Sequence, residues 1–182
     1  MPLNSLVDPE NICARCSATF GSCCIAVPGC GYHSTFVSDD EARVIEKYIS
    51  GSENLFTYET NTVEFIKYAG SLFPDYPDEV VRCFPLNGKH RSLHIDCFGR
   101  CRFLSGNGCI LPSAIRPGIC RIYPFWIIRG DLKLFTNDRC LAQQEASDIP
   151  GQLLLFQMSE NDVKKIYEDI IHAWFGKNRH GK

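Results

Sequence analysis

Eleven cysteines in 182 residues constrain this chain more than any other feature of its sequence. They are clustered: five lie between residues 13 and 30, five lie between residues 97 and 140, and Cys83 stands alone. Burial of thiols as small apolar side chains explains one or two cysteines, but it does not explain clustering. We therefore expect most of these cysteines to bind a metal ion or an inorganic cluster.

A framework of disulfide bonds is the weaker interpretation of the same cysteines. Their odd number prevents complete pairing within one chain. Residues 1–13 contain neither a basic region nor an apolar stretch, so we expect no secretory signal. The sequence therefore favours the cytoplasm, where thiols are kept reduced.

Charge and hydropathy argue against two kinds of partner. The chain has 19 Lys and Arg against 21 Asp and Glu, which is too even for binding nucleic acid through bulk positive charge. Its uninterrupted runs of large apolar residues are too short to span a membrane. A hydrophobic fraction of 45% is nevertheless enough to build a core, so we expect a folded chain with no nucleic acid and no membrane as partner.

The first cysteine block begins with a CxxC at residues 13–16, a spacing that lets two thiolates bind one metal from a single turn. The same motif serves thiol redox chemistry when it follows a strand and begins a helix. Residues 7–12 contain a proline and polar residues and show no strand pattern, which disfavours that alternative. Cys23 and Cys24 are adjacent, and neighbouring side chains diverge, so we expect them to serve two different metal atoms, or one atom and a structural role.

The second cysteine block has irregular spacing. The gaps between its cysteines are seven, ten and nineteen residues, for Cys101, Cys109, Cys120 and Cys140. The paired CxxC motifs of a zinc ribbon and the C-x2-C-x2-C run of a ferredoxin are both missing. Irregular gaps suit ligands that converge from several loops on one compact inorganic site.

Arginines are concentrated near the cysteines. Those that directly flank a cysteine are Arg15, Arg100, Arg102, Arg121 and Arg139, and Arg116 lies four residues before one. Guanidinium groups would offset the negative charge of bound thiolates and keep them deprotonated, although ordinary surface arginines would show the same spacing.

The histidines are weaker candidates for metal ligands. His33, close to Cys30, could complete a site of three cysteines and one histidine. We nevertheless expect a structural or surface role for all five, which are His33, His90, His94, His172 and His180.

Together these motifs resemble the YkgJ-type cysteine-cluster family, also described as a zinc- or iron-chelating domain. The matching elements are CxxC, CC, C-x-F-L from Cys101, a later Cys, and R-P-x-x-C-R-x-x-P-F over residues 116–125. The chain is also similar to the cysteine-rich part of flagellin lysine methylases. The resemblance implies that the metal ligands are Cys13, Cys16, Cys23, Cys24, Cys101, Cys109, Cys120 and Cys140. It also matches Arg116, Pro117 and Arg121, with Arg116 and Arg121 expected beside the cofactor.

The sequence departs from the family pattern at two places, and three of its cysteines lie outside that pattern. The gap between Cys16 and Cys23 is longer than in the family pattern, and Pro112 stands near a position where the family tends to carry Tyr. Cys30 stays open as a ligand. We expect the last two cysteines, Cys83 and Cys97, to be core thiols.

The predicted fold is a small, loop-rich α+β single domain, with helices around short hairpins organised around a cysteine-ligated metal site. The domain spans residues 1–176, followed by a basic, disordered tail at 177–182. Residues 1–37 and 73–77 are predicted to be loops. The predicted helices run from 38 to about 50, from 61 to about 69 with Gly70 as the cap, and from 159 to 175. The predicted hairpins cover 93–104, turning at 98–100, and 126–135, turning at Gly130.

Three functions remain open from the sequence. The favoured one is a 4Fe-4S protein that uses four of the eight matched cysteines, in a redox or cluster-assisted role. The first alternative is a structural zinc module, with two four-cysteine sites, that binds a protein partner. The second is an accessory component of a methyl-transfer enzyme, although the chain lacks a G-x-G-x-x-G loop for adenosylmethionine. Whether the chain is itself an enzyme stays undecided.

Overall fold

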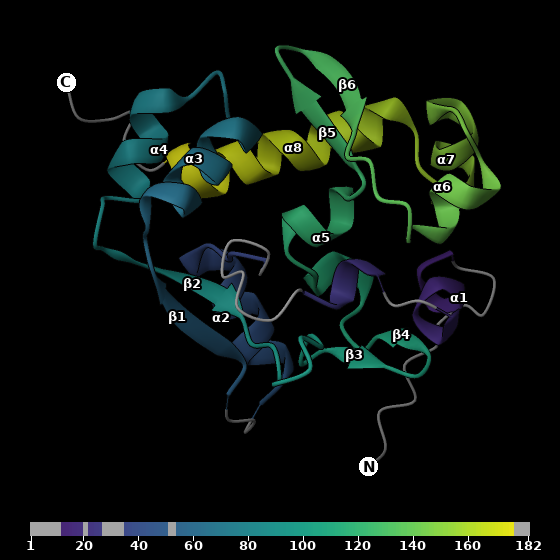
Figure 1. The fold of residues 1–182 in the computed structure, drawn as a ribbon, viewed down its shortest axis with the longest axis horizontal. Helices are drawn as coiled ribbons and strands as arrows, with labels where there is room; N and C mark the ends of the chain where they lie inside the picture. Colours follow the sequence, from purple (N-terminus) through teal and green to yellow (C-terminus); the bar gives the residue numbers. More distant parts are fainter. Residues whose placement is uncertain (1–11, 20–21, 27–34, 51–53, 177–182) are drawn as a thin grey trace.

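Helices and short strands are interspersed along this chain, and the strands pair in antiparallel fashion (Figure 1). The computed structural model describes residues 12–19, 22–26, 35–50 and 54–176. The predicted tail at 177–182, Cys30, His33 and His180 lie outside the described residues. The helical elements are α1 (Ile12–Thr19), η1 (Ser22–Cys24), α2 (Asp39–Tyr48), α3 (Val63–Leu72), α4 (Pro77–Cys83), η3 (Ser113–Ile115), α5 (Gly118–Ile122), α6 (Leu141–Glu145), α7 (Ile149–Leu155) and α8 (Glu160–Phe175).

The described strands form three separate two-stranded antiparallel sheets. They are β1 (Phe56–Thr60) with β2 (Lys89–Leu93), β3 (Leu104–Ser105) with β4 (Gly108–Cys109), and β5 (Phe125–Ile128) with β6 (Asp131–Leu134). The expected α+β class is confirmed at this level: mixed helices and small antiparallel sheets in a single domain. No helix among the described residues is long and apolar enough to cross a membrane.

Capping boxes begin two of the predicted helices. The Ser38 side chain accepts from the Glu41 amide at the start of α2, and the Glu41 carboxylate accepts from the Ser38 amide in return. Ser159 and Asp162 form the same reciprocal pair at the start of α8. Each box satisfies two helix donors that would otherwise lack partners, which confirms both predictions.

A core rich in aromatic side chains forms where α3, α4, the β5–β6 hairpin and α8 meet. Phe36 is fully buried there, and its ring makes edge contacts with Phe65 at 5.7 Å, Phe84 at 5.5 Å and Trp174 at 5.3 Å between centroids. The β5–β6 hairpin turns at Arg129 and Gly130, both with positive φ, as the Gly130 signal predicted.

Several predicted elements are wrong. Residues 12–19 form helix α1 rather than loop, α4 was not predicted, and α3 continues through Gly70 to Leu72. The predicted 93–104 hairpin is confirmed only at its centre, as an antiparallel bridge between Ile95 and Cys101 that is closed by the turn at 96–99. Its first residue, Leu93, instead ends β2, which pairs with β1.

Candidate metal centre

A single cavity of about 190 Å³ brings together all eight cysteines that the sequence singled out. Some of these cysteines lie more than a hundred residues apart in the sequence. Its sulfur-bearing residues are Cys13, Cys16, Cys23, Cys24, Cys101, Cys109, Cys120 and Cys140. The remaining described cysteines, Cys83 and Cys97, are not among the lining residues.

Six short segments carry these thiols to the cavity. Cys13 and Cys16 lie one turn apart on α1, so they share a helix face. Cys101 follows β2, Cys109 ends β4, and Cys120 lies in the middle of α5. The last two segments are η1, which ends with Cys23 and Cys24, and the start of α6, where Cys140 is the N-cap residue.

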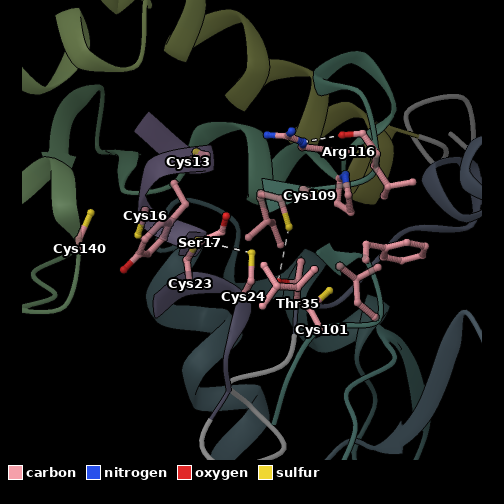
Figure 2. A pocket seen from close by; sticks show the side chains of 18 of the residues that line it. Cys13, Cys16, Ser17, Cys23, Cys24, Thr35, Cys101, Cys109, Arg116 and Cys140 are labelled. Atoms are coloured by element: carbon pink, nitrogen blue, oxygen red, sulfur yellow. Dashed lines mark hydrogen bonds between the residues drawn. The ribbon is translucent and has the colours of Figure 1, made fainter. Parts of the chain in front are cut away.

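The adjacent thiols of Cys23 and Cys24 lie close together. Their sulfurs are 3.8 Å apart, and one donates its S–H to the other. The expectation that these neighbouring side chains diverge is therefore wrong: both line the cavity from the 3-10 turn of η1, with Cys23 exposed and Cys24 half-buried. Figure 2 shows Cys23 and Cys24 between two further groups, with Cys16 and Cys140 on one side and Cys101 and Cys109 on the other.

Burial keeps most of these thiols protonated in the metal-free chain. Burial raises the pKa of Cys13 to about 11 and that of Cys101 to about 12. The pKa values of Cys109 and Cys120 are raised by burial as well. Cys24 differs: the hydrogen bond from the Cys23 thiol lowers its pKa, and the Arg116 charge adds to that effect. Metal binding at this site would release protons.

Arg116 is the cationic side chain of the cavity wall. Its Nε donates to the Leu111 carbonyl at 2.8 Å, which fixes the guanidinium beside the thiols. Burial is the larger effect on Cys13 and Cys109 and raises their pKa values, and the positive charge of Arg116 opposes that rise. The same charge helps to lower the pKa of Cys24.

The arginines that directly flank a cysteine are placed differently. Arg121 is half-buried on α5 but does not line the cavity. Arg15 forms an ion pair with Glu145 instead. The positive charge on the cavity wall therefore belongs to Arg116, which lies four residues before Cys120 in the sequence. The arginines directly next to a cysteine do not line the cavity.

The cavity wall also carries hydroxyl side chains that the sequence analysis missed, among them those of Thr35 and Tyr123. The Cys120 thiol donates to Thr35 Oγ1 at 3.7 Å. The Tyr123 hydroxyl accepts from Asn137 Nδ2 at 2.9 Å, and burial raises its pKa to about 12. Tyr123 lies inside the R-P-x-x-C-R-x-x-P-F motif at a variable position, so only its proximity to Cys120 in sequence could have indicated it.

The described histidines lie away from the cavity lining. His90 is buried, hydrogen-bonded to Asn61 Oδ1 at 2.7 Å and stacked on Phe65. Burial lowers its pKa to about 4, so it is a neutral core residue. His94 shares a hydrogen bond with Thr57. His172 is exposed on α8.

The two cysteines expected in the core behave differently from each other. The Cys83 thiol packs against the aromatic core and donates to the Trp174 carbonyl at 3.2 Å, as predicted. Cys97 is exposed, so the prediction of a core thiol is wrong there. The tight turn at 96–99 directs this part of the chain outward.

The donor set fits a thiophilic metal, although the ligands are not gathered at one point. Among the described residues, no three Cys, His, Asp or Glu side chains form a group that could hold a metal ion as they stand. Soft thiolate ligands are those that iron–sulfur clusters and zinc take. Binding would require the sulfurs around the cavity to move toward one another.

The buried thiols predict that the metal-free chain loses stability in alkali. In an unfolded chain the thiols have a pKa near 9.0. In the folded chain burial raises the pKa of Cys13 to about 11 and that of Cys101 to about 12. Their contribution is fully present below pH 9 and is lost as the pH rises toward 12. Urea unfolding followed by circular dichroism across this range measures the loss, which should be smaller in Cys101→Ser. An equal loss in wild type and Cys101→Ser would contradict this assignment.

Comparison with known proteins gives no further guide to the cavity. No protein-family model, no curated protein and no solved structure matches this chain.

Proposed function

We propose that this chain binds an iron–sulfur cluster of the 4Fe-4S type through the cysteines of the cavity, in a redox or cluster-assisted role. The observation that carries the proposal is the convergence of eight thiols from six segments on one cavity. These are the eight cysteines of the YkgJ-type resemblance, which supports including the chain in that family as part of the proposal.

The shape of the site favours a cluster over a single zinc ion. The thiols surround a volume of about 190 Å³, which suits a ligand with a volume of its own. A cubane cluster takes four thiolates at its corners, whereas zinc draws four ligands to one point. Phe36, Phe103 and Leu111 also line the cavity and are buried, so they would exclude water from a bound cluster.

Each part of the wall then has a role toward the cluster. The cysteines would supply thiolate ligands, and Arg116 would offset their negative charge. When bound, the cluster would supply one-electron chemistry at a potential set by the surrounding charge, hydrogen bonds and solvent exposure.

Anaerobic purification of the full chain tests the proposal. We expect a coloured protein that contains iron and acid-labile sulfide in equal amounts, with broad thiolate-to-iron absorption. Cys97→Ser is the matched control, because Cys97 is an exposed cysteine outside the cavity, and it should keep the wild-type iron content. A colourless protein with stoichiometric zinc and no iron would refute the iron–sulfur proposal.

A further inference from the structure

We infer that the eight thiols form two neighbouring four-cysteine sites and that their membership is fixed by the fold. The inference rests on the proposed metal-binding function. Site A consists of Cys24, Cys101, Cys109 and Cys120. Site B consists of Cys13, Cys16, Cys23 and Cys140.

Backbone hydrogen bonds connect three of the segments that carry site A. The Cys101 amide donates to the Cys24 carbonyl at 2.8 Å, which joins the end of η1 to the chain after β2. The Leu104 amide donates to the Cys101 carbonyl at 2.9 Å, and Leu104 pairs with Cys109 across the β3–β4 ladder. These three cysteines are therefore held in one continuous hydrogen-bonded unit.

Packing adds Cys120 to this unit. Cys101, Cys109 and Cys120 are partly buried against one apolar cluster, which includes Phe103 and Leu111. The position of α5, which carries Cys120, is fixed by Glu41, whose carboxylate accepts from the first amide of that helix at 2.7 Å.

Site B has a different apolar support. Cys140 belongs to a separate small cluster with Ile12 and Ala142, and Cys13 packs against that cluster. Helix α1 contacts α6, whose N-cap is Cys140, so both thiols of the CxxC lie near the Cys140 segment. Figure 2 shows Cys16 and Cys140 on the side of the cavity away from Cys101 and Cys109.

The adjacent pair supplies one ligand to each site. Cys24 is joined to site A through its backbone bond with Cys101. Cys23 lies on the side of Cys16 in Figure 2, and η1 contacts α1. With sulfurs 3.8 Å apart at the boundary, the two metal centres would be immediate neighbours.

Paired substitutions test the membership of each site. Cys109→Ala with Cys120→Ala removes two ligands from site A and leaves site B complete. Cys109→Ala with Cys140→Ala removes the same number of ligands but leaves three in each site. In anaerobically purified protein, we expect the first pair to keep half of the wild-type metal as an intact centre and the second pair to keep no intact centre. Equal metal loss in the two pairs would overturn the grouping.

A second experiment uses the wild-type chain and so does not depend on whether the variants fold. Partial metal removal with a chelator, followed by iodoacetamide and peptide mass mapping, reports which thiols are released together. We expect two sets of four with the membership given above, whereas release of all eight together, or of other sets, would overturn it.

The two proposals fail in different ways in these experiments. A wild-type chain that holds two zinc ions in the predicted sets refutes the iron–sulfur proposal and retains the grouping. A wild-type chain that holds a single centre refutes the grouping alone. A wild-type chain that binds no metal refutes both.

Discussion

Arg116→Gln is expected to lower the affinity of the cavity for its metal by about ten- to a hundred-fold, the usual effect of losing a group that supports the ligands. The Arg116 guanidinium donates to the Leu111 carbonyl. Its charge opposes the burial that raises the pKa values of Cys13 and Cys109, and it helps to lower the pKa of Cys24, so it acts on thiols of both inferred sites. Without that charge, protons would compete better with metal for every one of these sulfurs.

Competition with a chelator at several pH values measures this effect. The affinity deficit of Arg116→Gln should grow as the pH falls, because the thiols of the variant hold their protons more strongly. Arg102→Gln is the matched control: it removes an exposed arginine that directly flanks Cys101 but does not line the cavity. Arg116→Lys should recover part of the affinity, since it keeps the charge. Equal affinities in Arg116→Gln and Arg102→Gln would contradict the role of Arg116.

The elements that were predictable from the sequence are those with local signals. The capping residues Ser38 and Ser159 determine where α2 and α8 begin, and both interact with residues three positions away. The turn of the β5–β6 hairpin depends on Gly130, which adopts positive φ without strain. In each case the interaction that decides the structure lies within one turn of chain.

The elements that were missed depend on distant partners. Helix α1 is eight residues long, which is marginal in isolation, and it contacts β4 and α6. Strands β1 and β2 were not predicted, and they pair with each other across about thirty residues of chain. Periodicity within a five-residue strand carries no information about a partner at that distance.

The same distinction between local signals and distant contacts applies to the candidate site. The resemblance to the YkgJ-type family, which rests on the cysteine motifs, named the same eight cysteines that line the cavity. The resemblance named Arg116 and Arg121 together, and only the fold shows that Arg116 lines the cavity whereas Arg121 does not. The exposure of Cys97 and the two separate apolar clusters against which the cavity cysteines pack follow only from tertiary contacts.

Phe36→Ala is expected to cost the metal-free chain about 3–5 kcal/mol of stability, the usual range for truncating a buried phenylalanine. The Phe36 ring is 1% exposed and contacts the rings of Phe65, Phe84 and Trp174, so its removal leaves a void that rigid neighbours cannot fill. Urea unfolding measures the loss. Phe98→Ala is the matched control, since that ring is 75% exposed and should cost little. A cost for Phe36→Ala no greater than that of the control would contradict this account of the core.

The same substitution tests whether the core and the cavity are energetically linked. Phe36 lines the cavity, and its neighbour Thr35 accepts a hydrogen bond from the Cys120 thiol. A ligand that binds only the folded chain adds about 4 kcal/mol at a thousand times its Kd. Metal loading should therefore restore most of the stability that Phe36→Ala removes, because the substitution removes no cysteine from the cavity. If the loaded variant instead stays as unstable as the metal-free one, then Phe36 positions the ligands of the cavity as well as the core, and its iron content should fall with its stability.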